Sequence, residues 1–353
     1  MIVLGIETSC DETAAAVVRD DGEILADVVL SQIDQHRPFG GIVPEVAARA
    51  HLEFADRVVK QATDEAGIGF DELDAVAATG GPGLIGGVIV GVMTAKAIAC
   101  AQDIPFVAIN HLEGHALTAR LTEKVDFPYL LLLVSGGHSQ LLIVQSVGNY
   151  TRLGTTIDDA VGEAFDKSAK ILGLGYPGGP PIEGAARDGD PTRFDLPRPL
   201  RGKPGCHFSF SGLKAAVKRT VDGLPPGPLD TQDVNDMAAS FQAAVADVIG
   251  ERTERAIAEF RDQCPDGDTL VVAGGVAANT ALRARLEEVC DGHGMRLAAP
   301  PLKLCTDNGA MIAWAGIEHL RAGHKGQDLD FAPRPRWPLD PDAPQAAGAG
   351  VKA

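Results

Sequence analysis

Residues 5–13 read GIETSCDET, and residues 133–140 read LVSGGHSQ. Each loop follows a run of apolar, strand-forming residues and precedes another such run, which is typical of the tip of a β-hairpin. Both tips carry small and hydroxylic residues. Two such tips in matching places predict two similar lobes with a nucleotide cleft between them.

The segments around these loops repeat one order of elements. The first half predicts strands at 2–8, 13–20 and 23–30, a helix at 44–67, a strand at 74–79, a helix at 84–101, a strand at 105–109 and a helix from His111. The second half predicts strands at 129–135, 139–146 and 150–154, helices at 158–173 and 231–262, a strand at 269–273, a helix at 277–290, a strand at 296–299 and a helix at 307–322. We therefore expect an α/β fold with duplicated βββαβαβα domains.

Duplicated units of this kind resemble the actin, sugar kinase and Hsp70 superfamily, in which two domains clasp a nucleotide. The domains expected here are an N-terminal domain at 1–127 and a second domain at 128–300. An irregular insert rich in proline and glycine interrupts the second domain at 174–230. Residues 301–330 form a segment whose final helix packs back toward the cleft. The composition of 331–353 predicts a flexible tail.

The composition limits the class of protein. The chain has 353 residues, of which 45% are hydrophobic, enough for two cores. Its 6 cysteines form no CxxC pair, so the sequence suggests neither a zinc ribbon nor a secreted disulfide framework, and a reducing cytoplasm fits. No cationic segment precedes the first apolar stretch, so a signal peptide is not expected. The apolar run 84–101 contains glycines and Lys96, which favours a buried helix over a membrane span.

Charge argues against simple nucleic-acid binding. The formal net charge of −17 repels a polyanion unless positive charge gathers in one place. Positive charge does gather in residues 193–219. This stretch holds a single acid, Asp195, and four residues with rings: Phe194, His207, Phe208 and Phe210. The basic residues are Arg193, Arg198, Arg201, Lys203, Lys214, Lys218 and Arg219. On composition alone a solvated basic face is the plainer interpretation of 193–219, with a nucleic-acid surface as the alternative.

Two histidines have the spacing of metal ligands. His111 and His115 are four residues apart in a helical segment, so their imidazoles project from one face. A third ligand is available in Asp307 of CTDNGA, although a helix N-cap is its ordinary role. Two imidazoles and one carboxylate with open positions suit iron(II) or zinc, and the spacing alone does not choose between them.

Glycine pairs and acids mark further candidate sites. Gly274-Gly275 follows a predicted strand, and with Ser135-Gly136-Gly137 and Gly178-Gly179 it predicts a phosphate or ribose cradle. Adjacent Asp11 and Glu12 at the first hairpin tip must face solvent, a cation or a ligand. Asp166 is either a surface partner of Lys170 or an acceptor of ribose hydroxyls.

The ordered motifs of the chain resemble the tRNA threonylcarbamoyladenosine transferase family, once described as O-sialoglycoprotein endopeptidases, in its bacterial type. They are GIETSCDET, GGPGLIGG, HLEGH, LVSGGHSQL, DDAVGEAFDK, YPGGP, FSFSGLK, GGVAAN and CTDNGAMIA, over about residues 1 to 337. The resemblance implies one divalent metal per subunit, iron(II) or zinc, held by His111, His115 and Asp307. It implies substrate contacts at Leu133, Val134, Ser135, Gly136, Gly137, Asp166, Gly179, Glu183 and Asn279.

The resemblance also implies a reaction and partners. A threonylcarbamoyl group moves from threonylcarbamoyl-AMP to N6 of adenosine 37 in tRNAs that read ANN codons. Asp11 or Glu12 is our hypothesis for the general base, from their expected place at the cleft mouth. The stretch 193–219 becomes a candidate tRNA surface, because FSFSGLK is a family motif. The implied companions are a paralogous actin-like subunit and a small ATPase, in the cytoplasm and without a membrane.

Three other functions remain open at this point. An ATPase or sugar kinase of the same superfamily would share the fold, but a histidine and aspartate metal site has no obvious task there. A metallopeptidase of the HExxH type would need glutamate directly after the first histidine, where Leu112 stands. A non-catalytic scaffold that binds nucleotide is the third alternative.

Overall fold

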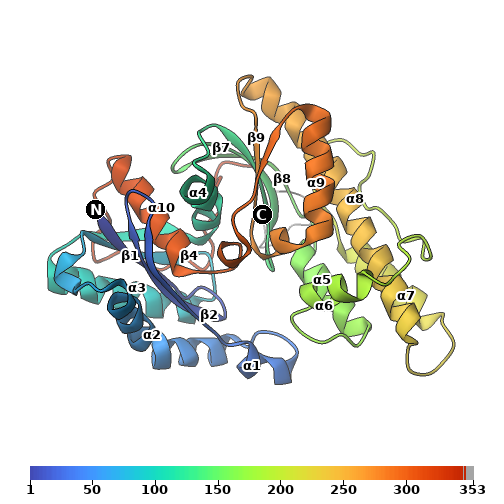
Figure 1. Ribbon diagram of the computed structural model, residues 1–353, viewed down its shortest axis with the longest axis horizontal. Helices are drawn as coiled ribbons and strands as arrows, with labels where there is room; N and C mark the ends of the chain where they lie inside the picture. The colour runs from blue at the N-terminus through green and yellow to red at the C-terminus, as the bar shows by residue number, and fades with distance from the viewer. Residues whose placement is uncertain (345, 347–353) are drawn as a thin grey trace. The chain divides into compact units, whose positions relative to one another are not determined.

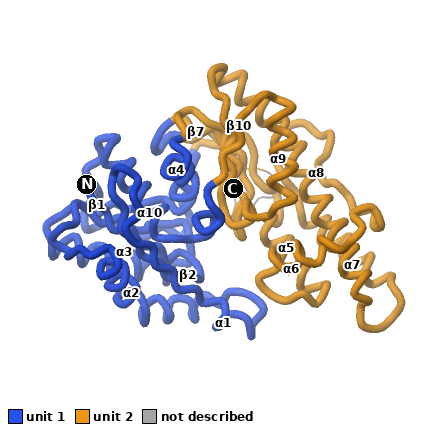
Figure 2. Tube along the Cα trace, in the orientation of Figure 1, with its two compact units in different colours: residues 1–124, 146–149, 300–341 blue, residues 125–145, 150–299, 342–353 orange. Residues whose placement is uncertain are grey.

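The computed structural model describes residues 1–344 and residue 346, and it divides into two compact units (Figure 1, Figure 2). Unit 1 comprises residues 1–124, 146–149 and 300–341. Unit 2 comprises residues 125–145 and 150–299 together with the described residues after 341. The segment after residue 299 thus belongs largely with the first half of the chain.

Unit 1 is built on a mixed sheet whose described strands have the order β3-β2-β1-β4-β5. The strands are β1 (Ile2–Glu7), β2 (Glu12–Arg19), β3 (Ile24–Ser31), β4 (Ala75–Gly81) and β5 (Phe106–Asn110). β1 pairs antiparallel with β2 and parallel with β4. Short turns join the first three strands, whereas the parallel strands need helical crossovers.

Helices cover both faces of this sheet (Figure 1). They are α1 (Ile33–His36), α2 (Pro44–Ala66), α3 (Ile85–Gln102), α4 (His111–Glu123) and α10 (Gly309–Arg321), with 3₁₀ turns η1 (Arg37–Phe39), η2 (Phe70–Glu72) and η4 (Leu302–Leu304). Leu4 and Ile6 of β1 enter the core beneath α2 and α3. Gly5 faces α10, where a Cβ would lie 2.3 Å from the backbone nitrogen of Ala313. Glycine at this position therefore lets α10 pack directly on the sheet.

Unit 2 repeats the same sheet. Its described strands have the order β10-β9-β6-β7-β8, which matches unit 1 strand for strand. They are β6 (Tyr129–Val134), β7 (Ser139–Ser146), β8 (Asn149–Thr155), β9 (Thr269–Ala273) and β10 (Arg296–Ala298). β6 pairs antiparallel with β7 and parallel with β9. The predicted duplication of the strand order is confirmed.

The helices of unit 2 include two that the sequence pattern did not predict. The helices are α5 (Val161–Ile171), α6 (Gly179–Ala186), α7 (Ser211–Asp222), α8 (Thr231–Gln263) and α9 (Thr280–His293), with the 3₁₀ turn η3 (Gly275–Ala278). The expectation of an irregular insert at 174–230 is wrong where α6 and α7 lie. Prolines in the first turn of α6 are compatible with a helix, and α6 packs against α8 while α7 packs against α5. Packing thus stabilises α6, whose composition disfavours a helix, whereas α7 contains no proline and is flanked by segments rich in proline and glycine.

Two further boundaries differ from expectation. α9 begins at Thr280 rather than at residue 277, because residues 275–278 form a 3₁₀ turn and Asn279 caps the helix. Residues 331–337 of the tail expected to be flexible instead pack on unit 1, where the Phe331 ring lies 6.2 Å from that of Phe106. The aromatic rings in this segment provide the apolar surface that its composition as a whole lacks. Residues 345 and 347–353 of that predicted tail lie outside the described residues.

α3 is long and apolar enough to cross a membrane by length and composition, with 39% of its apolar window buried. It packs against α2 and β4, and its Val88 and Val92 belong to the core. Thr8 Oγ1 donates to the carbonyl of Gly87 over 2.9 Å. One face of α3 thus belongs to the core, as expected of a buried helix, whereas Ile85, Ile89 and Met93 on the same helix are exposed.

Candidate functional site

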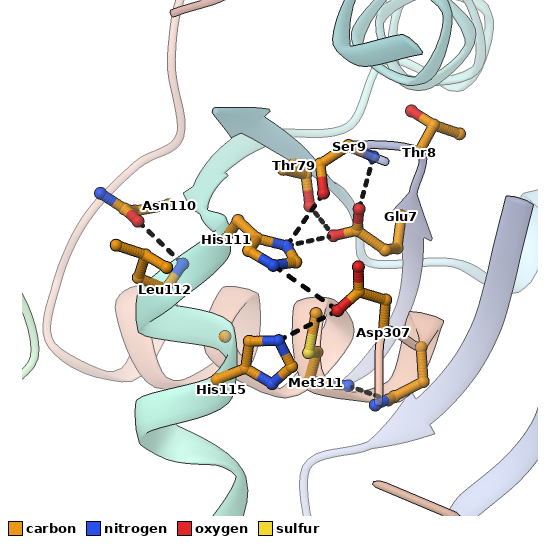
Figure 3. Close-up of polar contacts among 12 residues, drawn as sticks. Glu7, Thr8, Ser9, Thr79, Asn110, His111, Leu112, His115, Asp307 and Met311 are labelled. Carbon is orange, nitrogen blue, oxygen red and sulfur yellow. Dashed lines mark hydrogen bonds and ion pairs between the residues drawn. The ribbon is translucent and has the colours of Figure 1, made fainter. Parts of the chain in front are cut away.

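Two histidines of α4 and one aspartate before α10 come together in unit 1 (Figure 3). Nε2 of His111 and Nε2 of His115 lie 3.6 Å and 3.1 Å from the same oxygen, Asp307 Oδ1. The three candidate ligand atoms all lie within 4.8 Å of one another. The fold therefore brings together the three side chains that the sequence singled out as metal ligands.

The alternative role of Asp307 as a helix cap is wrong. The neighbouring Asn308 caps α10, because its Oδ1 accepts a hydrogen bond of 2.8 Å from the amide of Met311. Nδ2 of Asn308 also donates to the carbonyl of Thr306 over 2.7 Å. The Asp307 carboxylate is thus directed to the histidines instead of to the helix end.

A layer of polar side chains behind His111 was not predicted. Glu7 is fully buried, and its Oε2 accepts from Nδ1 of His111 over 3.0 Å. The amide of Ser9 donates to Glu7 Oε1 over 2.5 Å, and Thr79 donates its hydroxyl to Glu7 Oε2. A carboxylate on Nδ1 holds the ring so that Nε2 is the nitrogen facing Asp307. The sequence feature that could have indicated Glu7 is an acid at the end of an apolar strand, IVLGIE.

The electrostatics of this cluster favour charge on both members of the Glu7–His111 pair. Burial opposes the imidazolium form, but Asp307 and Glu7 outweigh it and raise the pKa of His111 to about 9. Burial alone would raise the pKa of Glu7, yet His111 and Ser9 lower it overall. A cation bound among the three side chains therefore has to displace a proton from His111.

Asp11 and Glu12 lie close to the same cluster. Asp11 is only 8% exposed and Glu12 is half-buried, so neither is an ordinary solvated turn residue. Burial, Asp307 and Asp11 together raise the pKa of Glu12 to about 10. The protonated form of Glu12 is thus favoured beside these acids, and a cation beside Asp307 would oppose part of this shift.

Buried polar side chains hold the loop that carries these acids. Nε2 of His51 donates to the carbonyl of Cys10 over 3.1 Å, and Nδ1 lies 2.8 Å from Thr13 Oγ1 and 3.3 Å from Gln32 Nε2. His36 Nε2 donates to Gln32 Oε1 over 3.2 Å. Because a carbonyl only accepts and an amide nitrogen only donates, His51 is neutral with its proton on Nε2. α2 thus fixes the backbone of the loop through His51.

Replacement of His51 by leucine is expected to lower the free energy of unfolding at pH 8 by about 1–3 kcal/mol, because buried partners lose their hydrogen bonds. Burial lowers the pKa of His51 below its ordinary value of 6.5, so the native protein binds fewer protons here than the unfolded chain. This contribution to stability is present above pH 6.5 and declines as the pH falls. Denaturant unfolding from pH 8 to 5 should therefore show a shrinking difference from wild type, and a constant difference would contradict the assignment. The exposed His324→Leu variant is the control.

In unit 2 the second hairpin tip is open at its glycines. Leu133 and Val134 end β6 with fully buried side chains, so only their backbone is available to a ligand. Ser135 closes the turn, since its amide donates to the carbonyl of His138 over 2.8 Å. A Cβ added at Gly136 or Gly137 would have no protein atom within 4 Å. Protein packing therefore does not require glycine at either position, and the space beside the tip is free of other protein atoms.

The turn after β9 lies against the end of β6. Gly274 has a φ of +92°, and a Cβ there would be 2.5 Å from the carbonyl oxygen of Val134. Glycine is needed on both grounds, since L side chains avoid this conformation. The Gly274-Gly275 turn and the LVSGG loop are thus neighbours in unit 2.

The other predicted contacts have structural partners within unit 2. Asp166 Oδ1 accepts from the amide of Gly178 over 2.7 Å, which places it beside Gly179 at the start of α6. Glu183 Oε1 accepts from the amide of Thr280 over 3.0 Å and so joins α6 to the start of α9.

Asn279 caps α9 by accepting from Leu282 over 2.9 Å, and its Nδ2 donates to Gln242 of α8 over 2.8 Å. Gln242 was not predicted from sequence, because it lies on α8, 37 residues before Asn279. Asn279 and Glu183 therefore meet at the start of one helix, whereas sequence alone left them 96 residues apart.

The basic stretch 193–219 is less positive than its sequence suggests. Acidic side chains pair with four of its described basic residues: Arg193 with Asp233 and Asp236, Arg198 and Arg201 with Asp247, and Lys218 with Asp222. Most of these acids come from α8. The partial neutralisation weakens the expectation that this stretch alone forms a tRNA surface.

The side chain of Asp158 holds the backbone and serines of the motif FSFSGLK by hydrogen bonds. Its Oδ1 accepts from the amides of Phe210 and Ser211 over 2.8 Å and 3.1 Å. Its Oδ2 accepts from the hydroxyls of Ser209 and Ser211 over 2.6 Å and 2.7 Å. Burial opposes ionisation of Asp158, but these bonds outweigh it and lower the pKa. Asp158 thus fixes the start of α7, with Lys214 in the first turn of that helix.

Comparison with known proteins decides the family. A family model described as tRNA N6-adenosine threonylcarbamoyltransferase matches residues 23–314. The chain belongs to this family. A tRNA N6-adenosine threonylcarbamoyltransferase of Paramagnetospirillum magneticum is 65% identical over 99% of this chain and 100% of its own length. Those of Rhodospirillum rubrum and Brucella canis are 65% and 62% identical, each over 99% of this chain and 98% of their own length.

Solved structures agree on the fold. Component A of (R)-2-hydroxyglutaryl-CoA dehydratase from Acidaminococcus fermentans has a TM-score of 0.52 at 16% identity, and the match covers 91% of this chain and 99% of that chain. Full-length HypF has a TM-score of 0.58 at 11% identity over 91% of this chain and 46% of its own. These structures have the actin-like ATPase fold, which confirms the predicted fold class. As a member of the tRNA N6-adenosine threonylcarbamoyltransferase family, the chain is a transferase, and nothing in the comparisons supports the alternative functions.

Proposed function

We propose that the chain transfers the threonylcarbamoyl group from threonylcarbamoyl-AMP to N6 of adenosine 37 in tRNAs that read ANN codons, with release of AMP. The observation that carries this proposal is the convergence of His111, His115 and Asp307 in a member of this family. An ATPase or kinase on the same fold has no evident task for two imidazoles and a carboxylate at one point.

His111, His115 and Asp307 hold one divalent cation per subunit. The donor set fits a cation, because both Nε2 atoms approach Asp307 Oδ1 and Asn308 performs the capping. Two imidazoles and one carboxylate with open positions suit iron(II), and zinc is the alternative. When bound, the cation supplies Lewis-acid polarisation of an oxygen of threonylcarbamoyl-AMP. Glu7 keeps Nδ1 of His111 occupied, so Nε2 is the ligating nitrogen.

Unit 2 recognises the adenylate part of the donor. Leu133 and Val134 contribute backbone groups, and Ser135, Gly136 and Gly137 contribute amides at an open tip, where donors can stabilise developing negative charge. The remaining contacts of the acyl-adenylate are Asp166, which accepts from ribose hydroxyls, with Gly179, Glu183 and Asn279.

The transfer itself needs positioning more than covalent catalysis. N6 of adenosine attacks the carbamoyl carbon, a carbon–nitrogen bond forms, and the carbon–oxygen bond to AMP breaks. AMP leaves with the bonding electron pair. N6 must lose a proton, and Asp11 accepts it in preference to Glu12, whose pKa is raised to about 10.

The purified chain, given labelled threonylcarbamoyl-AMP and unmodified tRNA, tests the proposed function. Label should move to adenosine 37 with one AMP released for each group transferred, in the presence of the companion subunits. Donor consumption without labelled tRNA would contradict the proposal, as would phosphate release from ATP by this chain alone.

The companions are a paralogous actin-like subunit and a small ATPase, and the complex is cytoplasmic. An apolar stripe on α3 fits the paralogous subunit: Ile85, Ile89 and Met93 are 44%, 44% and 57% exposed at intervals of four residues. Leu52 on the adjacent α2 is 70% exposed. Exposed apolar side chains at this spacing are typical of a helix that packs on a partner.

Replacement of Ile89 and Met93 by lysine should therefore abolish co-elution with the paralogous subunit while the isolated chain stays folded. Size-exclusion chromatography of the mixed subunits is the measurement. The matched control is Lys60→Met on α2, which is also exposed. Undiminished co-elution of the lysine variant would exclude this face.

A further inference from the structure

Residues 326–337, called the strap below, run across unit 1 and cover the edge of its sheet. The amide of Gln327 donates to the carbonyl of Phe106 over 2.8 Å, and Gln327 Oε1 accepts from the amide of Ala108 over 2.5 Å. β5 is the last strand of the described sheet, so these bonds pair an edge that would otherwise be open. The strap is thus a paired part of the fold.

A buried lysine of α3 fastens the strap. Nζ of Lys96 donates to the carbonyls of Leu329 and Phe331 over 2.8 Å and 2.7 Å. Lys96 is only 9% exposed, and a buried ammonium group is costly without such acceptors. In the sequence Lys96 only argues against a membrane span, whereas in the structure it binds the strap.

The strap also requires the glycines of the GGPG motif. The guanidinium of Arg334 lies over the rings of Phe331 and Trp337, 5.4 Å and 4.7 Å from their centroids. The amide of Arg334 donates to the carbonyl of Gly80 over 2.7 Å. A Cβ on Gly80 would lie 2.9 Å from the Phe331 ring, and one on Gly81 would lie 1.8 Å from the carbonyl oxygen of Arg334. The glycine pair therefore makes room for the strap.

Asn110 links the strap to the helix that carries both histidines. Its Oδ1 caps α4 by accepting from the amide of Leu112 over 2.9 Å, as Figure 3 shows. Its Nδ2 donates to the carbonyl of Trp337 over 2.8 Å. Asn110 is 3% exposed and directly precedes His111. The strap therefore fixes the rotamer of the residue that starts this helix.

A second path runs from the strap through the loop before α3. The amide of Gly83 donates to the carbonyl of Pro335 over 3.4 Å, and the amide of Leu84 donates to the carbonyl of Ser9 over 2.7 Å. Ser9 Oγ then lies 3.1 Å from Nδ1 of His111. The first path thus ends at Asn110, directly before His111, and the second ends at the His111 imidazole.

We propose that the strap is a positioning element for the metal centre: it holds Asn110 and the loop at 80–84 so that His111 is preoriented for its ligand role. The inference rests on the proposed metal site. If the strap is loosened, the first turn of α4 has to be ordered when the cation binds, and the affinity for the cation falls. Outer contacts of metal ligands commonly change affinity by about 10- to 100-fold.

Two substitutions test this without removal of a ligand. Asn110→Ser keeps an oxygen that can cap α4 but loses the donor to Trp337. Lys96→Met loses both bonds to the strap and lies on α3, outside α4. Loss of a positive charge would by itself favour cation binding, so a weaker affinity in Lys96→Met cannot be a charge effect. The exposed Lys60→Met is the matched control.

Anaerobic titration with Co²⁺, followed by its visible absorption, is the measurement, together with thermal unfolding of the metal-free proteins. We expect both strap variants to bind Co²⁺ about tenfold more weakly than wild type, with Lys60→Met unchanged. Wild-type affinity in both variants, with or without a lower melting temperature, would make the strap purely structural and overturn the inference. His115→Ala separates the two proposals: if it binds as tightly as wild type, the metal site itself is wrong and the inference falls with it.

Discussion

Replacement of Asp307 by alanine is expected to abolish both metal binding and threonylcarbamoyl transfer while the fold of unit 1 remains. Asp307 Oδ1 is the point on which both Nε2 atoms converge, so its loss leaves two imidazoles without the carboxylate that completes the set. Affinity for the cation should fall by at least about 100-fold, more than for loss of an outer contact. The helix should persist, because Asn308 caps α10.

Metal content after anaerobic loading and single-turnover transfer with excess donor are the measurements for Asp307→Ala. The exposed Asp64→Ala on α2 is the matched control, since it removes the same carboxylate elsewhere in unit 1. Chelation of the wild-type protein should abolish transfer before the protein unfolds. Full transfer by the metal-free protein would refute the assigned role of the cation.

Asp11→Asn is expected to reduce single-turnover transfer by about 100-fold or more, which is typical for loss of a general base. Glu12→Gln should cost much less, within about tenfold, because a protonated carboxyl and an amide have nearly the same shape and both can donate. The distinction rests on the environment of Glu12, whose pKa is raised to about 10 by burial, Asp307 and Asp11. Two adjacent acids thus take different roles.

The comparison of these two isosteric variants should be made at saturating donor, with Co²⁺ affinity measured for both. An unchanged affinity separates loss of proton transfer from damage to the nearby metal ligands. Wild-type rates in Asp11→Asn would exclude it as the base. A larger loss in Glu12→Gln than in Asp11→Asn would reverse the assignment.

The order of strands and most helices could be predicted because their signals are local. Apolar alternation around GIETSCDET and LVSGGHSQ defined both hairpins, and helical spacing placed His111 and His115 on one face of α4. Both sheets then have the predicted equivalent order. The helix α6 was missed because glycine and proline hide its periodicity, and α7 was missed because the segments on either side of it are rich in proline and glycine.

The outer layer of the metal cluster could not be predicted, because its members are distant in sequence. Glu7 lies 104 residues from His111, and Thr79 lies 72 residues from Glu7. The same limit applies to the basic stretch 193–219, because its acidic partners on α8 lie tens of residues later in the sequence. Charge counted along a segment therefore overstates the charge that the folded surface presents.

By itself the sequence determined the duplication, the family and the residue types of the metal centre, because spacing and motifs are properties of neighbouring residues. Only the tertiary structure decided that Asn308 rather than Asp307 caps α10, and that Glu7 orients His111. It also decided that the strap reaches Asn110. The physical reason is that a hydrogen bond or a buried charge acts over a few ångströms, and only folding brings distant residues within that range.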